Sequence, residues 1–102
     1  MVNLEKLGLF VILKAKSEKA TEVKQFLLGG LELAEQEQET KSWYAFQMDE
    51  TTFGIFDTFE HEKGREAHLN GKIAEALMRH AGDLLVDFQV ADIKKFNVLA
   101  AK

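Results

Sequence analysis

The chain contains no cysteine and no proline. Without cysteine it cannot form a disulfide framework, a thiolate metal site, an Fe–S cluster or a cysteine nucleophile. The lack of proline argues against a proline-rich linker or a disordered tail. Positive charge is also scarce, because 13 Lys and Arg stand against 17 Asp and Glu and give a formal net charge of −4. This balance disfavours nucleic acid or an anionic membrane surface as a partner.

Long hydrophobic runs are missing too, since no stretch approaches the ~20 apolar residues of a membrane span. The run Leu7–Leu13 is followed by Lys14 and Lys16 and by no small-residue cleavage site, so we interpret it as a buried strand rather than a signal peptide. We therefore expect a cytoplasmic protein. The 102 residues, 46% of them hydrophobic, are expected to form a single domain over residues 1–102.

The hydrophobic pattern predicts four strands and two helices. Short β-branched and aromatic segments predict strands at 7–16, 42–48, 52–59 and 84–99, the last interrupted near residues 91–92. Apolar residues at helical spacing predict one helix from Glu18 to about Ala34 and another over about Glu60–His80. The order β-α-β-β-α-β is that of a ferredoxin-like α+β fold, with a four-stranded antiparallel sheet and two helices on one face.

The predicted strands are apolar on both sides. Leu9 and Val11 alternate with Phe10 and Ile12 in the first strand, and the second and third strands show the same property. Two helices cover only one face of a sheet, and strands apolar on both sides are normally buried on both sides. The sequence therefore predicts a homodimer through the open face, because monomers rarely expose such a patch.

Two segments resemble a known family. SWYAFQMDETTFGIFDTFE, from Ser42, resembles the aromatic hairpin of the antibiotic biosynthesis monooxygenase family, which belongs to the dimeric α/β-barrel superfamily. REAHLNGKIAEAL, from Arg65, resembles the helix of that family in which "AH-L" is followed by "AL" nine residues after the His. The resemblance extends over nearly the whole chain. Its motifs are loose and specify the fold better than the chemistry.

The resemblance implies a homodimer with one pocket per subunit between the sheet and the helices. Enzymes of this family oxidise polycyclic aromatics or quinols with O₂ and use no metal, flavin or haem. The deprotonated, electron-rich substrate reacts with O₂ itself, so the protein has to supply a dry apolar pocket and handle one proton. We therefore expect no cofactor and a small aromatic ligand.

Carried over position by position, the helix histidine of the family is His68 and its strand aromatic is Trp43. Many relatives have a second histidine five residues after the first, followed by Phe; here these positions are Ile73 and Ala74. An isoleucine cannot exchange a proton, so this departure weakens the monooxygenase interpretation.

Related haem-degrading enzymes ligate iron through a histidine late in the same helix. That ligand position falls near Leu77 here, and His80 is almost one turn further along. Haem ligation is therefore poorly supported. The three histidines are scattered, and none has the i, i+4 spacing and carboxylate partner of a Zn or Fe triad, so no metal site is predicted.

His68 and Asp57 are the catalytic candidates. An imidazole titrates near neutral pH and suits proton transfer, although a half-buried or solvent-facing position for His68 is the alternative. Asp57 alternates with Phe53 and Ile55, so it either projects into the interior as a base of raised pKa or, as we favour, pairs with Arg65 or Lys63.

Trp43, Tyr44 and Phe56 are the candidate substrate-binding residues, because aromatic rings stack on aromatic ligands. Trp43 and Tyr44 are adjacent on one strand and must point to opposite faces, so at most one of them faces a given pocket. The alternative is that both belong to the core or to a dimer interface. The acidic residues Glu32, Glu35, Glu37 and Glu39 are interpreted as a solvated helix end.

Two functions follow from these residues. The first is a cofactor-independent monooxygenase acting on a small aromatic or quinol substrate. The second is a non-catalytic dimer that binds an apolar small molecule. An enzyme requires its polar candidates to converge on a single cavity, whereas a binding module does not.

Overall fold

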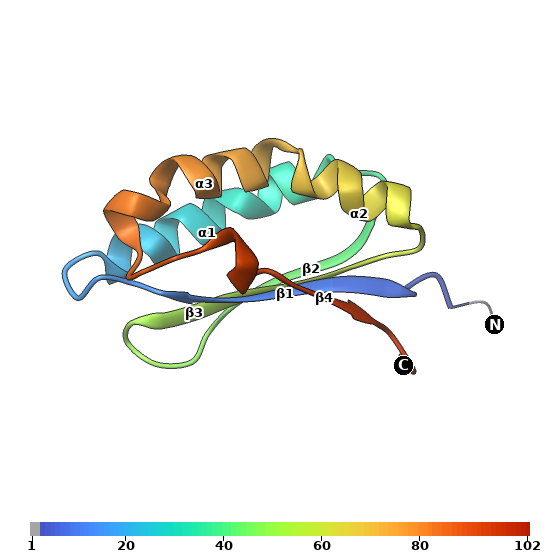
Figure 1. Ribbon diagram of the computed structural model, residues 1–102, viewed down its shortest axis with the longest axis horizontal. Coiled ribbons are helices and arrows are strands. Elements are labelled where there is room, and N and C mark those ends of the chain that lie inside the picture. Colours follow the sequence, from blue (N-terminus) through green and yellow to red (C-terminus); the bar gives the residue numbers. More distant parts are fainter. Residues whose placement is uncertain (1–2) are drawn as a thin grey trace.

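A computed structural model describes residues 3–102 (Figure 1). The elements, in chain order, are β1 (Leu7–Lys14), α1 (Ala20–Glu35), β2 (Thr40–Gln47), β3 (Thr52–Phe59), α2 (Glu62–Leu69), α3 (Lys72–Leu84), a 3₁₀ turn (Val90–Asp92) and β4 (Lys94–Asn97). The strands form one sheet in the order β2-β3-β1-β4, and all three pairings are antiparallel. All three helices lie over one face of this sheet (Figure 1). The predicted ferredoxin-like fold is confirmed.

The second predicted helix is two helices. Asn70 and Gly71 separate α2 from α3, and the side chain of Asn70 donates to the backbone carbonyl of Glu66, 2.9 Å away. Gly71 is extended and forms the N-cap of α3. An Asn-Gly pair is a common turn signal, and at this position it interrupts the helical pattern. The prediction of one continuous helix over 60–80 was therefore wrong.

The last strand is shorter than predicted. After α3, Leu85 forms an isolated bridge with Ala15, and the chain pairs again with β1 only over Lys94–Asn97. Between these contacts Asp87 has a φ of 49°, which few residues other than glycine adopt readily. The Gln89 and Asp92 side chains cap the 3₁₀ turn. These features remove residues 87–93 from the sheet.

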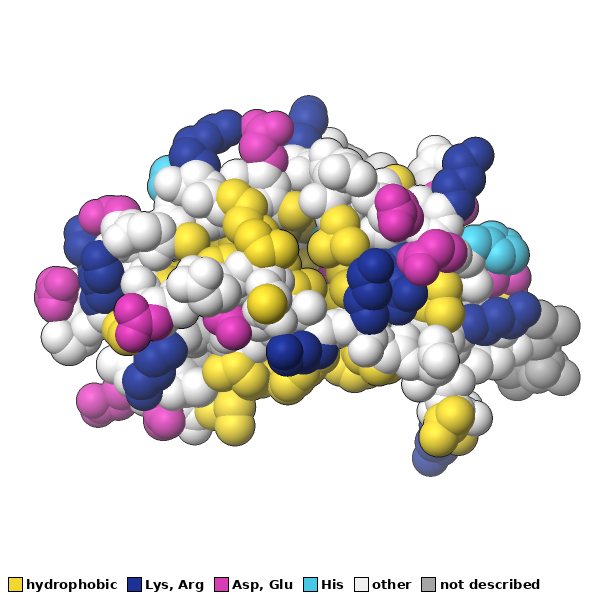
Figure 2. Space-filling view, viewed as in Figure 1, with side chains coloured by type: hydrophobic (Ala, Val, Ile, Leu, Met, Phe, Trp, Pro, Cys, Tyr) yellow, Lys and Arg dark blue, Asp and Glu magenta, His cyan; other side chains and the backbone are white. Residues whose placement is uncertain are grey.

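The hydrophobic core lies between the sheet and the helices. Strand residues Leu13, Phe53 and Ile55 face helix residues such as Val23 and Leu77, and all five are buried. Figure 2 shows hydrophobic side chains gathered between the helix layer and the sheet. Within the described residues 3–102, no helix is both long and apolar enough to cross a membrane.

The opposite face of the sheet is uncovered and aromatic. Phe56 stacks on Phe96 with ring centroids 5.1 Å apart, and Phe10 stacks on Phe46 at 6.1 Å. Two of these rings lie over a glycine of a neighbouring strand: a Cβ on Gly8 would come within 2.0 Å of Phe96. Figure 2 shows this face as a hydrophobic band below the sheet. The strands are thus apolar on both sides, as their sequence predicts.

Candidate functional site

Three side chains from different elements meet at the C-terminal end of α2. His68 lies between two carboxylates, with Nε2 2.8 Å from Oδ2 of Asp57 and Nδ1 2.6 Å from Oε1 of Glu37. The side chain of His68 is only 8% exposed. The alternative that His68 faces solvent was therefore wrong. Asp57 comes from β3, and Glu37 comes from the connection between α1 and β2.

Asp57 is a buried carboxylate on the helix-covered face. It follows Phe53 and Ile55 on the same side of β3, so the strand alternation points it inward, and it is 1% exposed. Oδ2 of Asp57 lies 2.8 Å from Nε2 of His68. The other oxygen, Oδ1, has no hydrogen-bond partner among the described residues. A buried polar group in this state is costly unless something else satisfies it.

The favoured pairing of Asp57 with Arg65 or Lys63 was wrong. Arg65 donates from Nε and Nη2 to the carboxylate of Glu62, 2.9 and 2.8 Å away, one turn earlier on α2. Its Nη1 donates to the carbonyl oxygens of Gly8 and Phe96 on β1 and β4. The guanidinium therefore connects α2 to the sheet by hydrogen bonds. The charged partner of Asp57 is His68 instead.

Glu37 is the member of the site that sequence reasoning missed. Its expected place on a solvated helix end was wrong, because its side chain is only 21% exposed. The hydroxyl of Thr40 donates to Oε1 of Glu37 at 2.8 Å, and the same oxygen contacts His68. Glu37 and His68 are 31 positions apart, so no local spacing signals the contact.

The electrostatics of the site follow from its two carboxylates. Burial by itself lowers the pKa of His68, but Asp57 and then Glu37 outweigh it and raise that pKa to about 9. Burial raises the pKa of Asp57, and the His68 contact opposes this rise. Phe59 packs beside the imidazole, with ring centroids 5.4 Å apart. The pair thus holds a shared proton tightly at neutral pH.

Asp57 and His68 line a small cavity between the sheet and α3. Its volume is about 30 Å³, and its other lining residues are apolar, among them Leu9, Ile55, Leu69, Ile73, Leu77 and Ile93. A cavity of this size holds about two water molecules. The two catalytic candidates, Asp57 and His68, therefore line one apolar cavity.

The aromatic candidates divide between the two faces. Trp43 lies on the helix-covered face, directly opposite Asp57 in the β2–β3 pairing, and its buried Nε1 has no hydrogen-bond partner in the described part of the chain. Tyr44 and Phe56 lie on the open face, with ring centroids 6.3 Å apart. Trp43 and Tyr44 point to opposite faces, as the strand geometry requires. Tyr44 and Phe56 cannot contact a ligand held beside Asp57.

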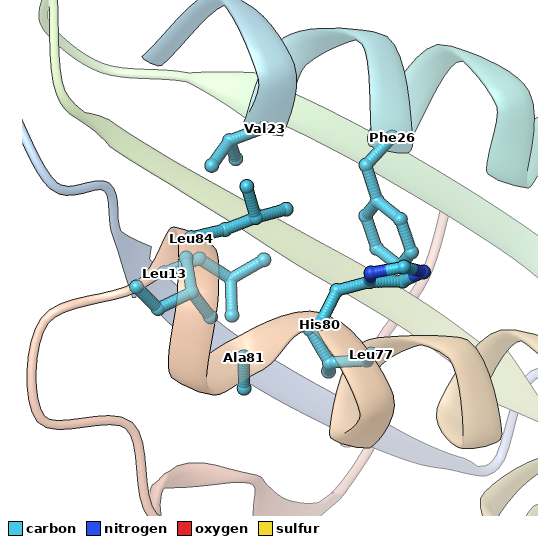
Figure 3. A pocket seen from close by; sticks show the side chains of 8 residues that line it. Leu13, Val23, Phe26, Leu77, His80, Ala81 and Leu84 are labelled. Carbon is cyan, nitrogen blue, oxygen red and sulfur yellow. The ribbon is translucent and has the colours of Figure 1, made fainter. Parts of the chain in front are cut away.

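His80 lies away from this cavity. Its ring packs edge-on against Phe26, with centroids 6.2 Å apart, beside a gap of about 10 Å³ that is also lined by Leu13, Val23 and Leu84 (Figure 3). Such a gap has no room for a haem. Within residues 3–102, no group of three or more histidine, aspartate or glutamate side chains is arranged to hold a metal ion.

Neither a protein-family model nor a curated protein matches the sequence. Solved structures do. A protein of unknown function from Nitrosomonas europaea is 44% identical with a TM-score of 0.93, and the match covers 99% of this chain and 96% of that one. The PA3566 protein from Pseudomonas aeruginosa has a TM-score of 0.80 at 18% identity, over 97% of this chain and all of its own.

A third similar structure is named for a function. A "putative antibiotic biosynthesis monooxygenase" from Nitrosomonas europaea has a TM-score of 0.81 at 15% identity, over 97% of this chain and 95% of its own. Similarity at that identity shows a shared fold. The chain therefore belongs to one family with the Nitrosomonas europaea protein of unknown function, and it has the antibiotic biosynthesis monooxygenase-like fold that its aromatic hairpin and histidine helix predict.

Proposed function

We propose that the protein is a cofactor-independent monooxygenase that oxidises a small aromatic or quinol substrate with O₂. One observation carries the proposal: a buried carboxylate, Asp57, lies in an apolar cavity with His68 beside its Oδ2 and with no hydrogen-bond partner for its Oδ1 among the described residues. A ligand hydroxyl that donates to Oδ1 of Asp57 supplies the missing partner. The likeness in fold to a protein named as a putative antibiotic biosynthesis monooxygenase supports the same reaction class.

The proposed chemistry begins with removal of one proton. Asp57 accepts the proton of the ligand, and the imidazolium of His68 stabilises the anion that remains. That electron-rich anion reacts with O₂. For an anthrone, the two hydrogens of one ring methylene and one O₂ become a ring carbonyl and one water, so no outside reductant is needed. The apolar lining keeps water away from the intermediates.

A second function is favoured by the size of the cavity. Pockets for small molecules usually enclose about 300–1,000 Å³, whereas this cavity has about 30 Å³. Ile73 occupies the position where many relatives have a second histidine, and it lines the cavity. The cavity therefore has to enlarge before a small molecule can enter it. A non-catalytic dimer that binds an apolar molecule there is the alternative.

The proposed assembly is a homodimer through the open face of the sheet. Phe10, Phe46, Phe56 and Phe96 form a continuous aromatic surface there, and Tyr44 at its edge is 61% exposed. A patch of this kind on a monomer is an association site. Sedimentation tests the assembly directly: we expect twice 11.6 kDa, and a mass of 11.6 kDa would overturn it.

Oxygen uptake tests the reaction. We expect purified protein to consume O₂ with an anthrone or a quinol, and we expect Asp57→Asn and His68→Ala to slow turnover about 100-fold, the usual contribution of a general base. His61→Ala is the matched control, because His61 is exposed and lies outside the cavity. Ligand binding without O₂ uptake would replace the monooxygenase by the binding module.

A further inference from the structure

Glu37 is a charged group that the proposed reaction does not use. It contacts the imidazole on the side away from Asp57, so the site has the order Asp57–His68–Glu37, with two carboxylates and one base. Its own position is fixed, because the Thr40 hydroxyl donates to Oε1 at 2.8 Å. The other carboxylate oxygen of Glu37, Oε2, lies close to Gly71. It fits there because Gly71 has no side chain: a Cβ on Gly71 would lie only 3.1 Å from Oε2.

The proton shared by Asp57 and His68 has two possible positions. In a buried pair, the neutral arrangement (carboxylic acid and imidazole) competes with the ion pair, because burial penalises separated charges. Asp57 is 1% exposed, and its Oδ1 has no hydrogen-bond partner among the described residues, so by itself it is poorly stabilised as an anion. A negative charge on the far side of the ring favours the imidazolium, since it lies closer to the imidazole than to Asp57.

We propose that Glu37 is a positioning residue, which holds the shared proton on His68 and so leaves Asp57 as an anionic proton acceptor in the cavity. The inference rests on the proposed function for its role in turnover, but not for the location of the proton. The charged groups in contact with His68 are Asp57 from β3 and Glu37 from the α1–β2 connection. On α2, Arg65 is occupied by Glu62.

The test compares Glu37→Gln with Glu37→Asp and with Glu35→Gln. Glutamine keeps an oxygen acceptor for Thr40 and His68 but loses the charge, and aspartate restores the charge. Glu35 is an exposed carboxylate two residues earlier and serves as the matched control. The location of the proton is read in the resting protein, from the ¹⁵N shifts of the His68 ring and the carboxyl ¹³C shift of Asp57.

We expect Glu37→Gln to weaken proton binding by the His68 ring at least tenfold and to move the Asp57 carboxyl signal toward that of the protonated acid. Glu37→Asp should recover much of the cationic ring signal, and Glu35→Gln should match the wild type. A Glu37→Gln ring that stays cationic, with an unchanged titration midpoint, would overturn the inference. If Glu37→Gln fails to fold, the His68 ring is measured in Asp57→Asn instead. The charge of Glu37 remains in that variant, so a ring that stays cationic at neutral pH supports the inference and a neutral ring overturns it.

Turnover gives an independent readout. If the wild type consumes O₂, we expect Glu37→Gln to lower kcat about tenfold with KM within twofold, and to shift the basic limb of the pH profile to lower pH. A rise in KM with an unchanged kcat would contradict a role in proton transfer. If the wild type consumes no O₂ but the ring signals shift as expected, the proposed reaction fails while the placement of the proton by Glu37 stands.

Discussion

The two faces of the sheet carry opposite chemistry on neighbouring residues. Asp57 points into the core beneath the helices, and Phe56, one residue earlier, points outward into the stacked rings of the open face. The inward face concentrates buried charge in one place, and the outward face presents apolar rings. Because strand residues alternate between faces, a two-residue segment contributes to a proton-handling site and to the surface that we assign to assembly.

The largest effect is expected on the inward face. His68→Leu removes the cation between two carboxylates and leaves Asp57 buried without compensation, which costs about 4 kcal/mol of unfolding free energy. Urea denaturation at pH 7 measures it. His61→Leu is the control, because His61 is exposed and should change stability by less than about 0.5 kcal/mol. Equal losses in the two variants would show that the buried pair contributes nothing to stability.

The open face should respond in association rather than in folding. Phe56→Lys places a charge in the stacked rings, and two-fold symmetry places it there twice, so we expect the dimer affinity to fall more than 100-fold, about 3 kcal/mol. Sedimentation over a concentration series measures the change. Leu28→Lys replaces an apolar side chain on α1 that is 61% exposed, and it should leave the affinity unchanged. Dissociation by both variants would contradict an interface confined to the sheet.

The pH dependence of the unfolding free energy reports on the inward face alone, because His68 lies there. The pKa of His68 is about 9 in the folded protein, above its ordinary value of 6.5. Its contribution is therefore fully present below pH 6.5 and is lost as the pH rises through 9. We expect the unfolding free energy to fall by up to about 3 kcal/mol over that interval. His68→Leu should abolish this slope, and a flat wild-type curve would mean that His68 binds no extra proton.

The order of elements was predictable because it depends on local periodicity. Alternation along β3 allowed an inward Asp57 as one of two alternatives, but the pairing with Arg65 or Lys63 was favoured. The partner of Asp57 was not predictable, because Arg65 and His68 both lie on α2 within reach in sequence, and only the packed geometry decides between them. The break at Gly71 is signalled by its Asn-Gly pair, but the surrounding helical spacing outweighed that signal in our prediction.

Glu37 shows most clearly where sequence reasoning ends. Its charge and its neighbours in the chain are typical of an exposed helix end, and three nearby glutamates share that context. The side chain becomes part of the site because the α1–β2 connection passes the end of α2, a contact between residues 31 positions apart. Such a contact depends on how the helices pack on the sheet, which periodicity does not specify.

The smallest effect tests how closely α1 lies on the sheet. Gly29 and Gly30 are adjacent in the helix, but only Gly30 faces the strands, where a Cβ would lie 3.3 Å from the Trp43 ring. Alanine at either position gains about 1 kcal/mol in helix propensity. Gly29→Ala, with open space around its Cβ, should realise that gain in unfolding free energy.

Gly30→Ala should gain little or lose stability, because its methyl group presses on a tightly packed indole. We also expect the Trp43 fluorescence to change in Gly30→Ala and to match the wild type in Gly29→Ala. Equal stabilisation by both would mean that the helix can lift away from β2. The same mobility would enlarge the space beside Asp57, since Trp43 is its direct neighbour across the strands. This pair of variants therefore measures how rigidly the inward face is closed.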